Sequence, residues 1–351
     1  MRILHLLKSD RFSGAENIAL LLMDLFDEDE TIYASPEGSI KEVVEQRKHS
    51  FYALNDTGAL EIRRVIKEIK PDIVHAHDFS MATSAAFALT DVPVIVHLHN
   101  NPLWLKTVNP KSIMFACALP LIKHIVSDSE AVQKDYLFRG LMDGKNTVIG
   151  NVVDAQCVQS KTEEFAIDED FDLIFLGRLT EAKDPIKFCA VINELKREYP
   201  DIRAVMVGDG DLRENIKQYI LQHRMQNNIL LTGFQKNPYP YLKASKVMVM
   251  PSKWEGFGLV SVEAMCLGKP VVCSGAGGLK NIITDDSGKI CSSVSSYCEE
   301  LKRLLTDKAY YEAKSKQARF ISGRYTNLQQ YKERILEKYK ECISQTSRKH
   351  P

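Results

Sequence analysis

The sequence lacks three features that mark common protein classes. No apolar run reaches the length of about 20 residues that a membrane-spanning helix needs, and no block of basic residues marks a nucleic-acid surface. The eight cysteines contain no C-x-x-C pair, and several stand in apolar runs, where cysteine behaves as a small hydrophobic residue. We therefore expect no membrane span and no nucleic-acid partner, and we predict a reduced, cytoplasmic protein.

The sequence also lacks the marks of a secreted protein and of a dinucleotide enzyme. Lys8 and Asp10 cut the first apolar run short, so residues 3–7 predict a strand rather than a signal peptide. No G-x-G-x-x-G follows that strand, which makes a dinucleotide oxidoreductase the least expected function. We place the protein in the cytoplasm or at the inner face of the cell membrane.

Short β-branched runs alternate with helical patterns along the whole chain, which predicts parallel sheets wound with helices. A chain of 351 residues is also too long for one ordinary core. The predicted strands are residues 3–7, 31–34, 51–54, 73–77, 94–99, 124–127 and 147–149, and then 173–176, 204–207, 229–232, 247–250 and 271–273. The predicted fold class is α/β, with two doubly wound Rossmann-like domains that face a central cleft.

The polar stretch 161–170 marks the domain boundary. We predict an N-terminal domain over residues 1–165 and a second domain over 166–325. A C-terminal helix over 326–351 is a candidate to pack back on the first domain. Ligands of doubly wound sheets bind at the carboxyl ends of the strands. The net charge is −6 over residues 1–165 and +6 over the rest, which weakly favours an anionic ligand in the second half.

The stretch 251–270 brings acids and glycines close together in the sequence. Glu255 follows a predicted strand, glycines flank the next turn, and Glu263 stands one turn into a predicted helix. Carboxylates accept hydrogen bonds from sugar hydroxyls, and N–H groups at a helix start attract phosphate. A nucleotide sugar carries both kinds of group. In the alternative interpretation, Glu263 interacts with the helix dipole and Glu255 is a solvated loop acid.

The full string, with Pro251 and Ser252 before it and Gly277 and Gly278 after it, resembles the E-x7-E signature of retaining, GT-B-fold glycosyltransferases of the family 4 type. The resemblance covers nearly the whole chain and is strongest over residues 177–278. It implies that Glu263 binds the ribose hydroxyls and Glu255 the hydroxyls of the transferred sugar. The implied backbone contacts to sugar and phosphate come from Gly256, Phe257, Gly258 and Leu259.

Two cations are expected on the donor side. Arg178 leaves the end of a predicted strand, and Lys183 follows just before a helix with Pro185 in its first turn. Both side chains could then neutralise a leaving diphosphate, with help from the helix N-terminus, and the resemblance implies that role. The spacing alone is more typical of two solvated surface cations.

A D-x-D pattern at Asp209 and Asp211 raises the question of a metal ion. Asp211 precedes a helical run and reads as its N-cap, and Gly208 belongs to a loop that resembles the nucleotide loop of the family. We therefore expect no metal and no cofactor. Phe234 borders the base in this interpretation, although a phenylalanine there is more often part of the core.

On the acceptor side, Gly14 opens a loop that resembles the glycine-bearing loop of the family, with Ser13 in place of the usual first glycine. His97 and His99 point to the same side of a strand, so spacing does not choose between them, and nothing in the sequence nominates a third metal ligand. The resemblance places His99 near the anomeric carbon of the donor sugar. It also places His77 and Asn100 on the acceptor side.

The apolar region 104–122 could dock a lipid-linked acceptor or a membrane surface, and core packing explains it equally well. The function that the resemblance implies is retaining transfer of a sugar from a nucleotide-diphosphate sugar to a carbohydrate or lipid-linked acceptor hydroxyl. The resemblance also implies a place in the synthesis of surface polysaccharides, lipid-linked oligosaccharides or glycolipids. The alternatives are an epimerase or phosphorylase of the same fold, or a non-catalytic scaffold that binds nucleotide sugars.

Overall fold

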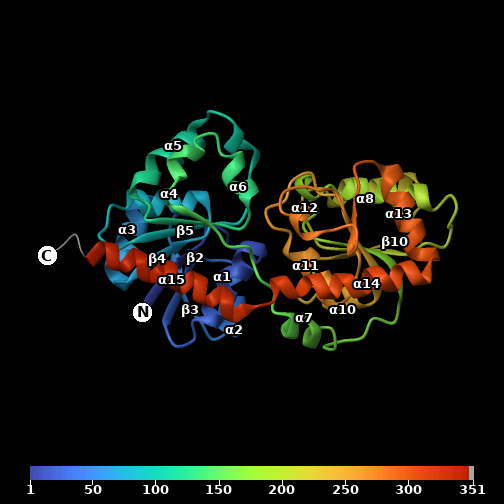
Figure 1. Ribbon diagram of the computed structural model, residues 1–351, viewed down its shortest axis with the longest axis horizontal. Helices are drawn as coiled ribbons and strands as arrows, with labels where there is room; N and C mark the ends of the chain where they lie inside the picture. The colour runs from blue at the N-terminus through green and yellow to red at the C-terminus, as the bar shows by residue number, and fades with distance from the viewer. Residues whose placement is uncertain (348–351) are drawn as a thin grey trace. The chain divides into compact units, whose positions relative to one another are not determined.

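The computed structural model describes residues 1–347, which form two compact units (Figure 1). The first unit comprises residues 1–151 and the C-terminal segment from Leu328. The second unit comprises residues 152–327. The final four residues of the predicted C-terminal segment lie outside the described residues.

The first unit is built on a parallel sheet of seven strands in the order β3-β2-β1-β4-β5-β6-β7. The strands are β1 (Arg2–Leu6), β2 (Glu30–Pro36), β3 (Ser50–Leu54), β4 (Ile73–Ala76), β5 (Val94–Leu98), β6 (His124–Ser127) and β7 (Asn146–Val148). The helices are α1 (Gly14–Leu25), α2 (Ile40–Gln46), α3 (Ala59–Ile69), α4 (Phe79–Phe87), α5 (Pro110–Ala118), α6 (Glu130–Asp135) and α15 (Leu328–Ser347). The 3-10 turns are η1 (Leu103–Lys106), η2 (Leu119–Leu121) and η3 (Arg139–Met142).

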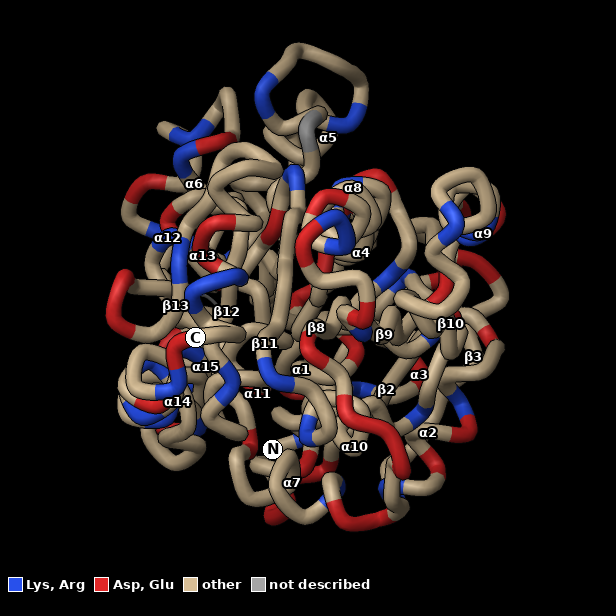
Figure 2. Tube along the Cα trace, turned by 90° about the vertical axis from the view of Figure 1, so that its right-hand side faces the viewer, with Lys and Arg blue, Asp and Glu red and all other residues tan. Residues whose placement is uncertain are grey.

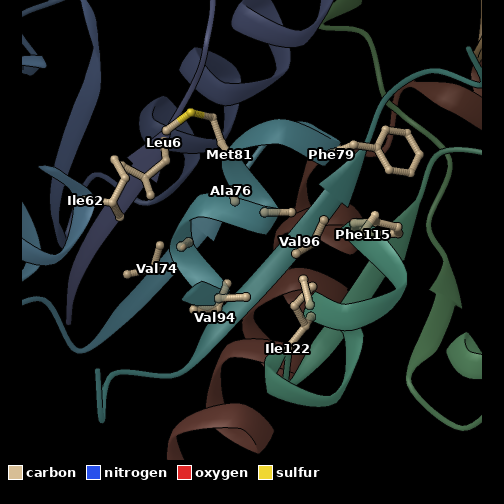
Figure 3. Packing of buried hydrophobic residues seen from close by; sticks show 14 of the residues in the cluster. Leu6, Ile62, Val74, Ala76, Phe79, Met81, Val94, Val96, Phe115 and Ile122 are labelled. Carbon is tan, nitrogen blue, oxygen red and sulfur yellow. The ribbon is translucent and has the colours of Figure 1, made fainter. Parts of the chain in front are cut away.

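The two faces of the first sheet bury different side chains because neighbouring strand residues point to opposite sides. On one face Val74, Ala76, Val94 and Val96 form an apolar core under α3, α4 and α5 (Figure 3). The other face packs against α1 and α15 and carries the histidines of β1, β4 and β5. The C-terminal helix thus completes the core of the first unit.

The second unit is built on a parallel sheet of six strands in the order β10-β9-β8-β11-β12-β13. The strands are β8 (Phe171–Leu176), β9 (Ala204–Val207), β10 (Ile229–Gly233), β11 (Ser245–Met250), β12 (Val271–Cys273) and β13 (Gly288–Ile290). The helices are α7 (Ala155–Lys161), α8 (Pro185–Leu195), α9 (Arg213–Gln222), α10 (Tyr239–Lys243), α11 (Leu259–Cys266), α12 (Leu279–Ile282), α13 (Val294–Thr306) and α14 (Lys308–Ser322). The 3-10 turns are η4 (Glu181–Lys183) and η5 (Gly323–Tyr325).

The predicted α/β class with two doubly wound parallel sheets is confirmed. Every predicted strand is present, and β13 is a strand that the sequence pattern did not indicate. The division between the units falls after Asn151 rather than after residue 165, because α7 packs against α10 and α11 of the second unit. Among the described residues, each helix is too short or too polar to cross a membrane.

Candidate active site

The carboxyl ends of β8 and β11 bring two of the predicted site residues together. Lys183 ends η4 beyond β8, Glu255 follows β11, and the two strands are neighbours in the sheet. The Lys183 ammonium donates to both carboxylate oxygens of Glu255, at 2.5 and 2.6 Å. The Glu255 side chain is only 9% exposed, so the ammonium neutralises a charge that has little water around it.

The loop after Glu255 is held by backbone contacts that only glycine permits. Gly277 has a φ of +55°, and a Cβ there would lie 1.7 Å from the carbonyl oxygen of Glu255. The N–H of the adjacent Gly278 donates to the carbonyl of Gly256 at 2.8 Å. Because a side chain at Gly277 would push this loop away, the glycine pair accounts structurally for part of the signature.

The same loop leads into helix α11, whose start offers free hydrogen-bond donors. Gly258 is the N-cap residue with a φ of +95°. Within residues 1–347, the backbone N–H groups of Phe257, Gly258 and Leu259 donate no hydrogen bond. The Phe257 ring itself is buried and packs edge-on against Tyr325. Free N–H groups at a helix N-terminus attract anions, so this loop end suits a phosphate.

Glu263 projects from α11 into buried surroundings. It is 8% exposed, and the Tyr239 hydroxyl donates to one of its carboxylate oxygens at 3.3 Å. Burial raises the pKa of this carboxyl to about 7, although the Tyr239 hydrogen bond and the nearby Lys161 both favour the charged form. A ligand that donates hydroxyls to this carboxyl would stabilise its ionised form.

The loops after β8 and β9 complete this edge of the sheet. Gly208 has a φ of +143°, and a Cβ there would lie 1.9 Å from the carbonyl oxygen of Gly177. This close approach fixes the backbone next to Arg178, which is exposed. In the described part of the chain the Arg178 guanidinium has no hydrogen-bond or ion-pair partner. A cation that the fold leaves unpaired is available to an anionic ligand.

The predicted residues of the first unit divide into exposed and buried ones. Gly14, the first residue of α1, and Asn100, just beyond β5, are exposed. His77 is 1% exposed, and the His99 side chain is 6% exposed. Both ring nitrogens of His99 have partners within the protein: Nε2 lies 3.0 Å from Nδ1 of His77, and Nδ1 lies 3.2 Å from Oδ2 of Asp128.

Two models of known families match the chain in consecutive segments. Residues 26–156 match the model described as Glycosyltransferase Family 4, and residues 159–321 match the model described as Glycosyl transferases group 1. The chain belongs to the family 4 glycosyltransferases. Members of this family use nucleotide-sugar donors and typically need no metal ion.

This glycosyltransferase is similar in sequence or in fold to known proteins along most of its length. It is 24% identical over 347 residues to an Escherichia coli galactosyltransferase whose name gives its acceptor as α-D-GlcNAc-diphosphoundecaprenol, covering 88% of this chain and 89% of the relative. It is 27% identical to an uncharacterized glycosyltransferase of Methanocaldococcus jannaschii, covering 60% of this chain and spanning 57% of that relative's length. The crystal structure of Anabaena Alr3699/HepE with UDP superposes with a TM-score of 0.85 at 19% identity, covering 97% of this chain and all of the other.

The structure corrects two local interpretations in the glycosyltransferase. Asp211 is not the N-cap of α9, because the helix begins at Arg213 with Leu212 as its N-cap. Instead, Asp209 accepts from Arg213 at 2.7 Å and from the Gly210 N–H at 2.8 Å. The core interpretation of Phe234 is also wrong, because this side chain is 60% exposed.

The sequence also failed to indicate how the histidines of the first unit group together. His5, His75 and His77 form one three-histidine group, and His77, His97 and His99 form another, with the nitrogens of each group within 4.8 Å of one another. His77 is thus the third residue that the sequence did not nominate beside His97 and His99. Asp128 was missed as well. Its signal was its position directly after β6, at the same sheet edge as His99.

Proposed function

We propose that the protein transfers a sugar from a nucleotide-diphosphate sugar to an acceptor hydroxyl with retention of anomeric configuration. The observation that carries this proposal is the composition of one sheet edge in the second unit. There the Lys183–Glu255 pair, the free N–H groups at the start of α11 and the buried Glu263 all follow the ends of neighbouring strands. A cation, N–H donors and carboxylates are the groups that a diphosphate joined to two sugars requires.

The Lys183–Glu255 pair can hold a donor without separating. An ammonium has three N–H donors, and Glu255 takes two of them, so one remains for a phosphate oxygen. The two carboxylate oxygens keep further lone pairs, which can accept hydrogen bonds from hydroxyls of the transferred sugar. Pairing in the free protein therefore places both groups in advance, which reduces the ordering that binding has to impose.

The same groups account for the electrostatics of the transfer. As the sugar–phosphate bond breaks, negative charge develops on the departing diphosphate, and Lys183, Arg178 and the α11 N-terminus stabilise it. We propose same-face attack, in which the acceptor hydroxyl forms the new glycosidic bond and its proton passes to the departing phosphate oxygen. This sequence balances charge and proton without a metal ion or a covalent intermediate.

The first test of this proposal is the pH dependence of nucleotide binding, which follows from Glu263. Because burial raises its pKa to about 7, acid protonates the carboxylate that the ribose hydroxyls would donate to. If only the ionised form binds, the affinity for a UDP-sugar, whose diphosphate has no group that titrates near pH 7, is expected to be roughly tenfold higher at pH 8 than at pH 6. Isothermal calorimetry in buffers of different ionisation enthalpy should also record proton release on binding near pH 7.

Two variants make the calorimetry specific to this carboxyl. Glu263→Gln is expected to weaken binding of the UDP-sugar and to remove its pH dependence. Glu312→Gln removes an exposed carboxylate of α14 and should leave both unchanged. A pH dependence that persists in Glu263→Gln would contradict the assignment. A thermal-shift screen of UDP-, GDP- and ADP-sugars, run first, selects the nucleotide.

We further propose that the acceptor is lipid-linked and that the first unit contacts a membrane surface. The apolar region 104–122 divides between the two roles considered for it: Leu105, Phe115, Leu119 and Ile122 are buried in the core, whereas other side chains face outward. We define the apolar patch as the exposed residues Val108, Ile113, Met114, Leu121, Leu137 and Leu141, which are 42–67% exposed.

Basic residues are frequent in the segments that carry the apolar patch, and two of them are paired there: Lys106 with Asp135 and Lys134 with Glu130. Lys and Arg lie along the segments next to α5 and α6 (blue in Figure 2), and they include Lys106, Lys111, Lys123, Lys134 and Arg139. An open hollow beside the patch is lined by Gln133, Lys134, Leu137, Arg139, Gly140 and Asp143. Exposed apolar side chains on segments that also carry cations favour the surface of an anionic bilayer. The acceptor named for the Escherichia coli relative is itself a polyprenol diphosphate.

Vesicle flotation tests the membrane contact. The protein is expected to float with vesicles containing phosphatidylglycerol and to remain unbound with vesicles of phosphatidylcholine alone. Met114→Asp combined with Leu141→Asp should weaken the binding several-fold, because it places charge in the apolar patch. Leu60→Asp changes a residue of the same unit that is 84% exposed and lies outside the patch, so it should leave vesicle binding unchanged. Equal flotation of all three proteins would rule out this surface.

A further inference from the structure

Two opposite charges of the second unit lie near each other without forming an ion pair. Glu263 is on α11, and Lys161 is the last residue of α7, which packs against α10 and α11 (Figure 1). Burial raises the pKa of the Glu263 carboxyl, and the Tyr239 hydrogen bond and then the Lys161 charge lower it, so Lys161 lies within electrostatic reach. Among the described residues, however, the Lys161 ammonium forms no hydrogen bond or ion pair, and only its main-chain carbonyl is bonded.

One oxygen of the Glu263 carboxylate is left for a ligand. Oε1 accepts from the Tyr239 hydroxyl at 3.3 Å, whereas Oε2 has no hydrogen-bond partner in the part of the chain that the structure describes. Oε2 is not one of the fully enclosed atoms that lack a partner, so part of its surface is open. A largely buried carboxylate with one open, unpartnered oxygen is suited to accept a hydrogen bond from a ligand hydroxyl.

Glu263 also lies on the same side of α11 as the free N–H groups at the start of that helix. Leu259 is the first residue of α11, and Glu263 follows it by four residues. This spacing puts the two on one face, about 6 Å apart along the helix axis. A ligand with a phosphate at the N–H groups and a hydroxyl one helical turn further along would therefore contact both, within a single unit.

The main chain of Lys161 is fixed beside this face by Asn237. The Asn237 amide donates to the Lys161 carbonyl at 2.8 Å, and the Asn237 side-chain oxygen accepts from the Tyr239 N–H at 3.1 Å. The same asparagine thus holds the end of α7 and the start of α10, from which the Tyr239 hydroxyl reaches Glu263. An open hollow borders Lys161 and Asn237, so the half-buried ammonium has space next to it.

The helix position of Lys161 offers a simpler explanation for its charge. Lys161 is in the last turn of α7, where a cation interacts favourably with the helix dipole. That role requires neither a neighbouring carboxylate nor a ligand. The two explanations differ in one measurable respect, because a lysine that only stabilises the helix end cannot distinguish between ligands that differ by one hydroxyl.

We propose that Lys161 is a further donor-binding residue, which recognises the ribose of the nucleotide together with Glu263. One ribose hydroxyl donates to Glu263 Oε2 and accepts from the Lys161 ammonium, because a hydroxyl is both a donor and an acceptor. The hydroxyl thereby bridges the two charges that remain apart in the free protein. This inference rests on the proposed function, in which the ligand is a nucleotide sugar, and it adds Lys161 to the site.

Calorimetry with UDP, 2′-deoxy-UDP and 3′-deoxy-UDP tests the proposal. The measurements are made at pH 8, where the terminal phosphate is ionised in all three. In the unchanged protein, loss of the bridging hydroxyl is expected to weaken binding about tenfold. Lys161→Met should weaken UDP binding by about the same factor. In Lys161→Met the loss of that hydroxyl should then cost at most about twofold more, because the two changes remove the same interaction.

Two further lysine variants make the result specific. Lys161→Arg keeps a cationic donor and should preserve the preference for the hydroxyl. Lys243→Met removes an ammonium of α10 that is paired with Glu163 at 2.7 Å, and it should leave all three affinities unchanged. GDP and its deoxy forms replace the uridine nucleotides if the thermal-shift screen selects guanine.

The outcomes separate this inference from the proposed function. If each deoxy nucleotide loses the same factor in Lys161→Met as in the unchanged protein, Lys161 does not contact the ribose, and the proposed function is unaffected. Lys161→Met with unchanged UDP affinity would also overturn the inference. If the unchanged protein binds neither UDP nor GDP, the proposed function fails and this inference fails with it.

Discussion

Acidification from pH 7 to pH 5 is expected to remove most of the stability of the first unit. Burial lowers the pKa of His5 to about 3 and that of His97 to about 4, and it lowers the pKa values of His75 and His77 well below the ordinary value. Neighbouring histidines lower all four further. The folded protein therefore keeps these rings neutral at pH 5, whereas the unfolded chain binds a proton at each of them.

The direction of this change in stability with pH follows from how many protons the folded and the unfolded chain bind. A histidine whose pKa is lowered by folding contributes stability above its unfolded pKa of about 6.5 and loses it as the pH falls further. At pH 5 each ring that stays neutral in the folded protein lowers the free energy of unfolding by about 2 kcal/mol, since one pH unit corresponds to about 1.4 kcal/mol. Four rings together cost up to about 8 kcal/mol, which is comparable to the whole stability of an ordinary domain.

Urea unfolding followed by circular dichroism at several pH values measures this loss. The slope of the unfolding free energy against pH should correspond to an uptake of about four protons near pH 5. His97→Phe removes one of the four rings together with its 3.0 Å contact to Asp128, and it should reduce the uptake by about one proton. A stability that falls by less than about 2 kcal/mol between pH 7 and pH 5 would show that the rings are not buried as neutral groups.

Lys183→Ala is expected to reduce both turnover and stability. It removes a cation that the transfer needs at the departing diphosphate, so turnover should fall by more than about tenfold. It also leaves the Glu255 carboxylate, which is 9% exposed, without its partner. An unpaired buried charge costs several kcal/mol, and with the remaining solvent access we expect a loss of about 2 kcal/mol in the free energy of unfolding.

A second substitution separates the two effects. In Lys183→Ala combined with Glu255→Gln the buried charge is gone, so stability should return toward that of the unchanged protein, while turnover should stay low. Arg178→Ala should lower turnover in the same way without a loss of stability, because the guanidinium is exposed. If the double variant recovered turnover, the Lys183–Glu255 pair would be structural only.

A matched ion pair lies at the other end of the same two strands. Lys246 and Asp172 stand near the starts of β11 and β8, 2.9 Å apart, and the lysine is 54% exposed. Exposed pairs contribute about 0–1 kcal/mol, so Lys246→Ala should change stability little and turnover not at all. Comparing Lys183→Ala with Lys246→Ala therefore shows whether the effects depend on where the lysine lies and how buried its partner is, rather than on the loss of any lysine.

The sequence predicted the fold class and every strand but β13, and it nominated donor-side residues whose roles stay predictions. It could do so because alternation of strand and helix patterns and the spacing of Glu255 and Glu263 are local properties of the chain. It misassigned the N-cap of α9 and left open whether Phe234 is exposed or part of the core. Both depend on how a loop packs after its strand ends, which residue type alone does not determine.

The sequence alone determined two parallel sheets and a glycine-rich edge with two acids. Strand and helix patterns, with periods of 2 and 3.6 residues, and a contiguous motif can be recognised from the order of residues along the chain. Only the tertiary structure decided which of these groups meet. Lys183 and Glu255 are 72 residues apart, His5 and His77 are likewise 72 apart, and Tyr339 reaches His75 across 264 residues to bond its Nδ1 at 2.6 Å. Such contacts follow from the order in which strands pair and from the return of α15. Both are settled by burying the two faces of a sheet at once, which no local stretch of sequence specifies.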